Sequence, residues 1–299
     1  MTINEIKLAL EEKGYITEVE YVTKNNCILT GLRLVNDNGI SPVIYIDELL
    51  NEDFSEKAID NIINTFENNM TTEKINTSAL FSFLQDKEYI KSNIYVTLEQ
   101  SSDYEKKYLS IPSQLEDIDM VFKINLSQDI CDTLNLDKDA EGMYTIKLTS
   151  ELLNSMNTDI EELIPYALEN VSKDTYVVNM IQIMKEMMHL TDDDIYDDML
   201  SVDSRMYVLT NTGKCFGASG ILTNTLSDFA KGHNTETLIV LPSSVHECIV
   251  IIPDTDNEDL AEYARMVKEV NETQVQPIDQ LSNYAYIYNV TSNSFETIK

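Results

Sequence analysis

The segment 206–253 constrains the fold more than any other part of the chain, because short apolar runs alternate in it with turn residues. Residues 206–209 have the composition of a β-strand, and Asn211 and Gly213 tolerate the positive φ angles that tight turns need. Residues 215–222 are apolar again and are predicted to return as a second strand. The pattern therefore predicts a β-hairpin at the start of this segment.

A second hairpin is predicted from residues 238–241 and 247–252, because Pro242 between them has no amide hydrogen and ends a strand. The two hairpins are predicted to share one sheet, with a short polar helix between them. The rest of the C-terminal third adds a helix and a last strand pair, predicted at 258–270, 284–289 and 294–298. Residues 200–299 are thus predicted to form a ββαββαββ layer.

Helical and strand-like patterns also alternate through the first 200 residues. Helical spacing of apolar residues predicts helices at 3–13, 55–69, 77–84, 159–171 and 177–190. Strand composition predicts strands at 16–22, 27–35, 42–46, 94–98, 118–126 and 143–148. Strands joined by hairpins and grouped with helices favour an α+β fold of antiparallel sheets with packed helices over a parallel doubly wound sheet. We predict three regions, at 1–100, 101–200 and 201–299.

Two patterns near the middle of the chain have both a functional and a structural interpretation. Methionines recur at helical spacing in 177–190, close to His189, which suggests a soft metal site or a partner groove. Burial in the core produces the same spacing and is the interpretation we favour. The acidic run 192–198 lacks the glycine and terminal glutamate of an EF-hand loop, so we predict a solvated connector.

The charge balance excludes some classes of partner. The chain has 52 acidic and 21 basic residues and a formal net charge of -31. Affinity for nucleic-acid phosphates and for anionic membranes comes from Lys and Arg, so we predict neither direct nucleic-acid binding nor membrane binding. The carboxylates are spread through nearly every segment, which favours a solvated surface over a decoy that imitates DNA.

Cysteine usage and hydropathy predict a cytoplasmic protein. The start of the chain lacks the basic residues and apolar core of a signal peptide, and no run approaches the roughly 18 apolar residues of a membrane-spanning helix. Four cysteines lie far apart without a CxxC pair, which indicates reduced thiols rather than a disulfide framework or a zinc site. Cys215 and Cys248 fall in predicted strands, where we expect buried, unreactive thiols.

One polar cluster is the candidate site, namely the predicted turn that contains Ser243, Ser244, His246 and Glu247. A hydroxyl, an imidazole and a carboxylate are the groups of nucleophilic catalysis, but neighbours in one turn seldom reach the required geometry. We therefore predict a ligand- or partner-binding corner without catalytic residues. Its predicted members are Asn211, Ser243, Ser244, His246, Glu247 and Asn271.

Signatures of cofactor and metal sites are missing from the sequence. There is no GxGxxG, GxxxxGK[ST], GxSxG or HExxH motif, and the three histidines fall in separate segments. We accordingly predict no cofactor and no metal site.

Several short motifs resemble a known bacterial family. They include MYVLTN, FGA, LPSSVHE and MVKEVNETQV in the C-terminal third, and VTKNN, ISPVIY and LSNY elsewhere, at 206–211, 216–218, 241–247, 266–275, 22–26, 40–45 and 281–284. With these motifs the chain resembles the uncharacterised domain-of-unknown-function family DUF5688 over nearly its full length. The resemblance implies a family and no activity.

These observations predict a soluble cytoplasmic binding or interaction protein without intrinsic catalysis, whose partner is an unknown protein or small molecule. One alternative is a hydrolase-like enzyme that uses Ser243 or Ser244 with His246. A second alternative is an acidic inhibitor or nucleic-acid-mimicking decoy in bacterial or phage defence or counter-defence.

Overall fold

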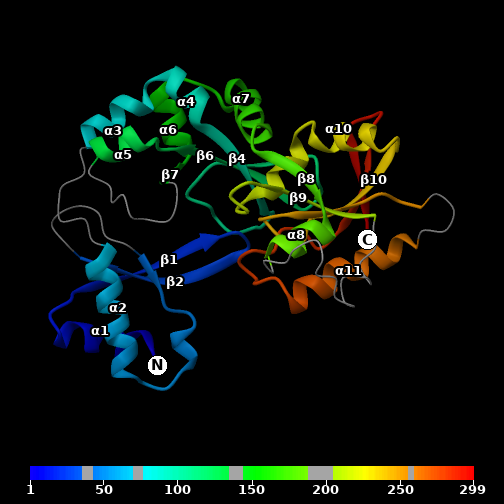
Figure 1. Cartoon of the computed structure of the whole chain (residues 1–299). Coiled ribbons are helices and arrows are strands. Elements are labelled where there is room, and N and C mark those ends of the chain that lie inside the picture. The colour runs from blue at the N-terminus through cyan, green and yellow to red at the C-terminus, as the bar shows by residue number, and fades with distance from the viewer. Residues whose placement is uncertain (36–42, 70–76, 135–143, 188–204, 255–258) are drawn as a thin grey trace. The chain divides into compact units, whose positions relative to one another are not determined.

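The computed structural model describes residues 1–35, 43–69, 77–134, 144–187, 205–254 and 259–299. The fold is α+β, as predicted, and its strands form antiparallel sheets (Figure 1). The chain divides into two compact units, made of Met1–Asp86 with Leu126–Tyr144 and of Lys87–Asn125 with Thr145–Lys299. The three regions predicted from the sequence stay a prediction.

The first unit packs two of its helices, α1 (Ile3–Glu12) and α2 (Glu56–Asn69), against an antiparallel meander. The strands are β1 (Thr17–Lys24), β2 (Cys27–Leu34) and β3 (Val43–Tyr45), and the other helices are α3 (Thr77–Leu84), α5 (Gln128–Thr133) and the 3-10 turn η1 (Leu49–Asn51). Thr2 and Glu5 form a capping box at the start of α1, and Gly14, at φ 91°, follows its end. Apolar side chains of α1, α2 and the sheet form the core, among them Ile6, Leu10, Leu32, Ile59 and Phe66. The predicted meander and helices are confirmed.

The second unit begins with a small sheet covered by helices. Its central strand β6 (Ile118–Asn125) pairs with β4 (Ile94–Gln100), β5 (Ser110–Pro112) and β7 (Thr145–Lys147). The helices around it are α4 (Lys87–Asn93), α6 (Ser150–Met156) and α7 (Ile160–Ser172). The predicted pairing of residues 118–126 with 143–148 is confirmed, whereas α4, α6 and β5 were not predicted.

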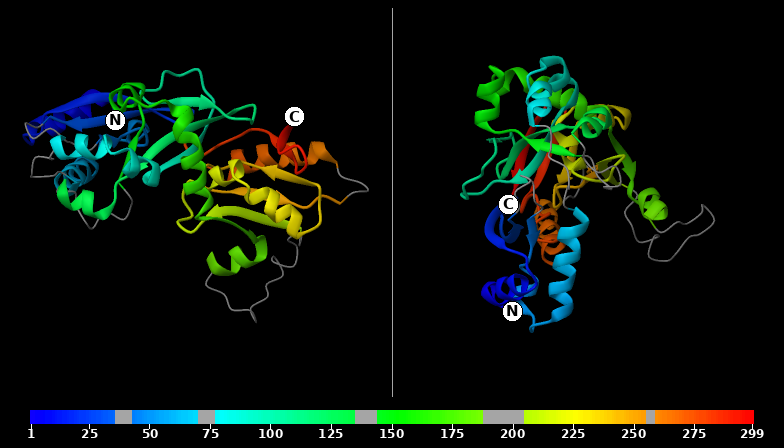
Figure 2. Two further views of the ribbon diagram at one scale, coloured as in Figure 1. Left: turned by 90° about the horizontal axis from the view of Figure 1, so that it is seen from above. Right: turned by 90° about the vertical axis from the view of Figure 1, so that its left-hand side faces the viewer.

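A six-stranded antiparallel sheet completes the second unit, in the order β13-β12-β10-β11-β9-β8. Its strands are β8 (Thr175–Asn179), β9 (Met206–Asn211), β10 (Thr237–Leu241), β11 (Cys248–Ile251), β12 (Ala285–Asn289) and β13 (Ser294–Ile298). The remaining helices are α8 (Met180–Met187), η2 (Gly217–Leu222), α10 (Thr225–Gly232) and α11 (Leu260–Thr273). Figures 1 and 2 show α10 and α11 on opposite faces of this sheet.

Two apolar cores explain why both faces are covered. Alternate side chains of β10 point to opposite faces, so Leu238 and Val240 join a core with η2 and α10, while Ile239 and Leu241 pack against α11. The predicted hairpins β10–β11 and β12–β13 are confirmed, and the first of them shares its sheet with β9.

The predicted second strand at 215–222 is wrong, because residues 217–222 form the 3-10 helix η2. Both edges of β9 are already paired, with β8 and with β11, so the returning chain has no edge to join. It crosses close to the sheet instead. A Cβ atom at Gly217 would lie 2.7 Å from the Asn211 nitrogen, and one at Gly220 would lie 2.3 Å from the Thr175 Cγ2. The two glycines therefore permit this close approach, and the predicted ββαββαββ order is corrected at its second element.

The predicted helix at 177–190 is also corrected at its start, because residues 177–179 belong to β8. Paired with β9, they extend the sheet before α8 begins at Met180. Met188, His189 and the acidic run 192–198 lie outside the described residues.

Candidate functional site

The predicted corner is a loop that joins β10 to β11 and lies against a second loop at residues 279–282. The Val245 nitrogen donates a hydrogen bond to the Asp279 carbonyl at 2.9 Å, and Ser244 forms a β-bridge with Gln280. Gln280 in turn donates through Nε2 to the Asn271 carbonyl at 2.8 Å. The second loop thus connects Ser244 with Asn271, although no local sequence pattern indicated that it belonged to this corner.

The two serines of the corner are buried. Ser243 and Ser244 are 7% and 6% exposed, and the Ser244 Oγ accepts a hydrogen bond from the His246 backbone nitrogen at 3.0 Å. This is a local side-chain-to-backbone bond that shapes a turn. It gives no support to the alternative in which a serine is activated by the His246 imidazole.

The His246 ring is held by two neighbours. Its Nδ1 accepts a hydrogen bond from the Phe216 nitrogen at 3.3 Å, and its Nε2 lies 3.4 Å from the Asp279 Oδ1. Since Nδ1 accepts, the proton of the neutral ring is on Nε2, facing Asp279. Both ring nitrogens are therefore occupied by protein partners, and the ring fixes the turn that precedes η2.

Two of the remaining predicted members, Asn211 and Asn271, also bond to the protein. Asn211 accepts from the Cys215 nitrogen at 3.1 Å and donates to the Cys215 carbonyl at 3.0 Å, which closes its own turn. Asn271 donates to the Ser282 carbonyl at 2.8 Å, and Glu247 is exposed. The structure thus brings the predicted residues into neighbouring turns, where most of their polar groups shape the backbone.

The turn before η2 corrects one prediction about the cysteines. Cys215 is exposed rather than buried, and it lies between Lys214 and Phe216, which have positive φ angles of 49° and 56°. Desolvation raises the pKa of its thiol, and the charge of Lys123 opposes that rise. Cys248 is buried in β11 as predicted, and desolvation raises the pKa of its thiol.

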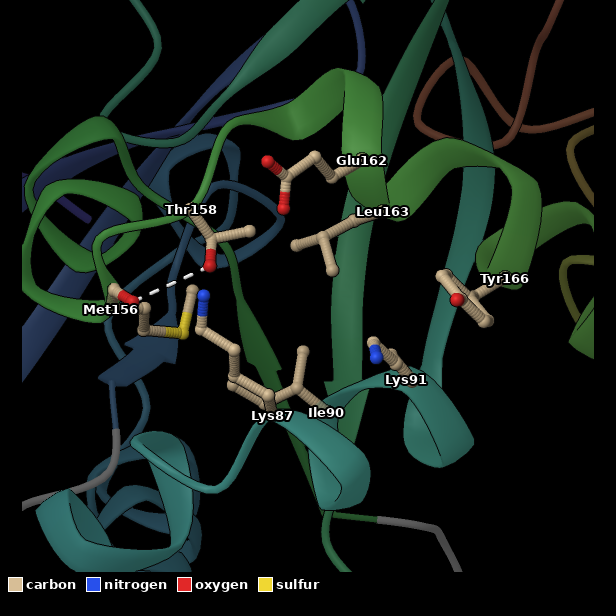
Figure 3. Close-up of a pocket in the computed structure, with 8 residues that line it drawn as sticks. All are labelled: Lys87, Ile90, Lys91, Met156, Thr158, Glu162, Leu163 and Tyr166. Atoms are coloured by element: carbon tan, nitrogen blue, oxygen red, sulfur yellow. Dashed lines mark hydrogen bonds between the residues drawn. The ribbon is translucent and has the colours of Figure 1, made fainter.

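A second candidate is a pocket of about 300 Å³ between α4 and α7 (Figure 3). It has an apolar base, an aromatic wall and several polar groups. The lining residues are Lys87, Ile90, Lys91, Met156, Thr158, Glu162, Leu163 and Tyr166. Small-molecule sites are commonly concave, mostly apolar and supplied with a few polar groups, and this volume is at the lower end of their range.

Helical spacing explains how this pocket is built. Lys87 and Lys91 are four residues apart on α4 and therefore share a face, as Leu163 and Tyr166 do three residues apart on α7. The Asn170 Nδ2 on α7 donates to the carbonyls of Lys91 and Ile94, each at 2.8 Å. These bonds attach the C-terminal end of α4 to α7 and hold the two walls together.

The two lysines of the pocket differ in their partners. The Lys91 Nζ is 2.8 Å from the Glu88 Oε1, and this bond raises the pKa of Lys91. The Lys87 Nζ donates to the Asn157 carbonyl at 3.4 Å and, within the described part of the chain, forms no ion pair with a carboxylate. The pocket was missed from the sequence, where its only sign was a pair of lysines at i, i+4 beside Ile90.

In the described ranges, no group of three or more His, Cys, Asp or Glu side chains is arranged to hold a metal ion. No helix among the same residues is both long enough and apolar enough to cross a membrane.

Comparison with protein families identifies the chain. A model of a family of unknown function, DUF5688, matches residues 3–290. The chain belongs to the DUF5688 family. This confirms the resemblance seen in the sequence, and the matched part of the DUF5688 protein includes both the corner and the pocket. Comparison with curated proteins and with solved structures found no match.

Proposed function

We propose that this DUF5688 protein is a binding protein and that the pocket between α4 and α7 binds a small organic anion. One observation carries the proposal: two ammonium groups line one apolar pocket in a chain whose formal net charge is -31. Ile90, Met156 and Leu163 are 2%, 6% and 4% exposed and supply the apolar base. An anion with an apolar portion can contact both the ammonium groups and the apolar base.

The acidic surface does not oppose such a site at physiological salt. The Debye length at that ionic strength is about 8 Å, so carboxylates farther away than this are largely screened. An ammonium group in direct contact with a bound anion lies well inside that distance, so their attraction is screened much less. Lys87 and Lys91 therefore attract an anion more strongly than distant carboxylates repel it, and Glu162 is the one carboxylate among the lining residues.

The test is a titration of the full chain, followed by NMR chemical shifts, with carboxylates, sulfonates and phosphate esters and with uncharged analogues of the same shape. The test variant is Lys87→Met with Lys91→Met. The control is Lys231→Met on α10, an exposed lysine whose ion pair with Asp228 spans 3.7 Å. We expect wild type and control to bind the charged compounds, and the double variant to lose about tenfold or more in affinity.

Two results would contradict the proposal. One is equal binding of charged and uncharged analogues, which would show that the ammonium groups contribute nothing. The other is unchanged affinity in the double variant, which would place any bound anion elsewhere.

Other predictions stay as they were made. A binding role for Asn211, Ser243, Ser244, His246, Glu247 and Asn271 stays a prediction, as does the decoy alternative. A cytoplasmic location is proposed as well. It is supported by four cysteines that are all free, since disulfides are rare in that compartment.

A further inference from the structure

We infer that the pocket between α4 and α7 selects a monocarboxylate whose charged end contacts Lys87 and whose short apolar chain extends toward Tyr166. This inference rests on the proposed function and names its ligand class. It follows from the unequal partners of the two lysines and from the position of the acidic residues around them.

Lys87 is the better anchor for an anion because little competes for its charge. Among the described residues its hydrogen-bond partner is the neutral carbonyl of Asn157, at the long distance of 3.4 Å. In Figure 3 the Lys87 side chain runs toward Met156 and Thr158. The Thr158 hydroxyl donates a hydrogen bond to the Met156 carbonyl at 3.4 Å, a long bond that a ligand oxygen can replace. One carboxylate can thus accept hydrogen bonds from Lys87 and Thr158 together.

The Lys91 end of the pocket disfavours a second negative charge. Lys91 is already paired with Glu88 at 2.8 Å, and the negative charge of Glu162, another lining residue of the pocket, also raises the pKa of Lys91. A second carboxylate placed there would have to displace Glu88 and would add to the negative charge that Glu162 already contributes to the pocket lining. Like charges in proximity repel, so a dicarboxylate or a phosphate monoester dianion is a poorer ligand than a monoanion.

The walls between these ends suit an apolar chain. Leu163 and Ile90 are almost fully buried. In Figure 3 Ile90 lies between the two lysines, and Leu163 extends toward it from α7. Tyr166 stands beyond them, with its ring centroid 5.3 Å from the Lys91 Nζ. A chain that covers Leu163 and reaches the Tyr166 ring removes apolar surface from water, which favours binding. The volume of about 300 Å³ limits the ligand to a small molecule.

Four probes test the ligand class: hexanoate, its dicarboxylate counterpart adipate, its neutral counterpart hexanamide, and hexyl phosphate. Each is titrated into wild type, Lys87→Met, Lys91→Met and Glu162→Gln, with NMR shifts as the readout and circular dichroism as the check of folding. We expect hexanoate to bind about tenfold more tightly than the other three probes. Lys87→Met should lower hexanoate affinity about tenfold, and Lys91→Met by less than about threefold. Glu162→Gln should improve adipate binding.

The outcomes separate this inference from the proposed function. If adipate or hexyl phosphate binds more tightly than hexanoate and loses affinity in Lys87→Met, the pocket binds anions but the monocarboxylate assignment is wrong. If Lys91→Met weakens hexanoate more than Lys87→Met does, the proposed orientation is wrong. If no charged probe binds, or none responds to either lysine variant, the inference and the proposed function are both wrong.

Discussion

The carboxylate of Asp117 links two parts of the second unit that are far apart in the sequence. It accepts hydrogen bonds from the Ser282 Oγ at 2.8 Å, from the Asn283 nitrogen at 3.0 Å and from the Tyr286 hydroxyl at 2.6 Å. Ser282 is 165 positions away in the chain. Asp117 lies directly before β6, and Tyr286 is in β12, so these bonds connect the small sheet to the six-stranded sheet. We predict that Asp117→Ala destabilises the unit strongly.

The expected loss of stability depends on whether each of the three donors finds another acceptor when the carboxylate is removed. The Ser282 hydroxyl can turn to the Tyr284 carbonyl, 3.2 Å away, and the exposed Asn283 can bond to water. Tyr286 is 1% exposed, so its hydroxyl stays buried without a good acceptor. An unpaired buried donor costs about 1–3 kcal/mol, and the lost charged bonds add to this. We expect Asp117→Ala to lower the free energy of unfolding by about 3 kcal/mol, and Tyr286→Phe, which removes the donor itself, by about 1 kcal/mol.

Urea unfolding followed by near-UV circular dichroism measures these changes, because tyrosine is abundant and the chain has no tryptophan. Hydrogen exchange of β12 shows whether the loss is local to this link. The control is Asp228→Ala, an exposed carboxylate in an ion pair of 3.7 Å, which should change stability by less than about 0.5 kcal/mol. A loss of under about 1 kcal/mol in Asp117→Ala, or an equal loss in Tyr286→Phe, would refute the reasoning.

Three further predictions concern single side chains of the second unit. Gly217→Ala should lower the free energy of unfolding by about 2 kcal/mol, because the added Cβ would lie 2.8 Å from the His246 carbonyl oxygen. The control Gly232→Ala adds a Cβ in open space and should leave the free energy of unfolding in urea nearly unchanged. A thiol reagent should label the exposed Cys215 in the folded protein and the buried Cys248 only on unfolding, as mass spectrometry of peptides would show; equal rates would contradict the structure. Burial raises the pKa of Tyr95 to about 12, above its ordinary value of 10.0, so its contribution to stability is present below pH 10 and is lost as the pH rises toward 12. Between these two pH values the free energy of unfolding should fall by up to about 1.4 kcal/mol per pH unit because of this group. An equal slope in Tyr95→Phe would show that Tyr95 is not the group responsible.

Hairpins were the most predictable part of the fold, because their turn residues are local in sequence. Pro242 marked the end of β10, and alternation over residues 285–288 marked β12. The strand predicted at 215–222 was wrong because both edges of β9 are paired, and a local sequence pattern does not show which edges of a strand are free. Gly217 and Gly220 are a sequence indication of close backbone approach, but the strand-like residues around them led to the prediction of a strand.

The pocket was invisible for a different reason. The helix α4 has seven residues, which is too short for apolar periodicity to distinguish it from a loop. Its lysines line a pocket only because the fold places Leu163 and Tyr166 of α7 beside them. These residues are far apart in the sequence, as the hydrogen bond from Lys87 to Asn157 shows with its separation of 70 positions. Residue types alone directed attention to the corner at His246, because serine, histidine and glutamate are common in active sites.

A polar side chain that is fully bonded within the protein is poorly suited to bind a ligand, since binding would first break those bonds. His246 is occupied at both ring nitrogens. Glu99, 8% exposed, accepts from the Tyr108 hydroxyl at 2.6 Å and from the Lys147 Nζ at 3.0 Å. Lys87 combines one long bond to a neutral carbonyl with an open apolar volume beside it. An added anion would gain a charged hydrogen bond there at the loss of one weak bond, which supports the proposal that the pocket between α4 and α7 binds a ligand.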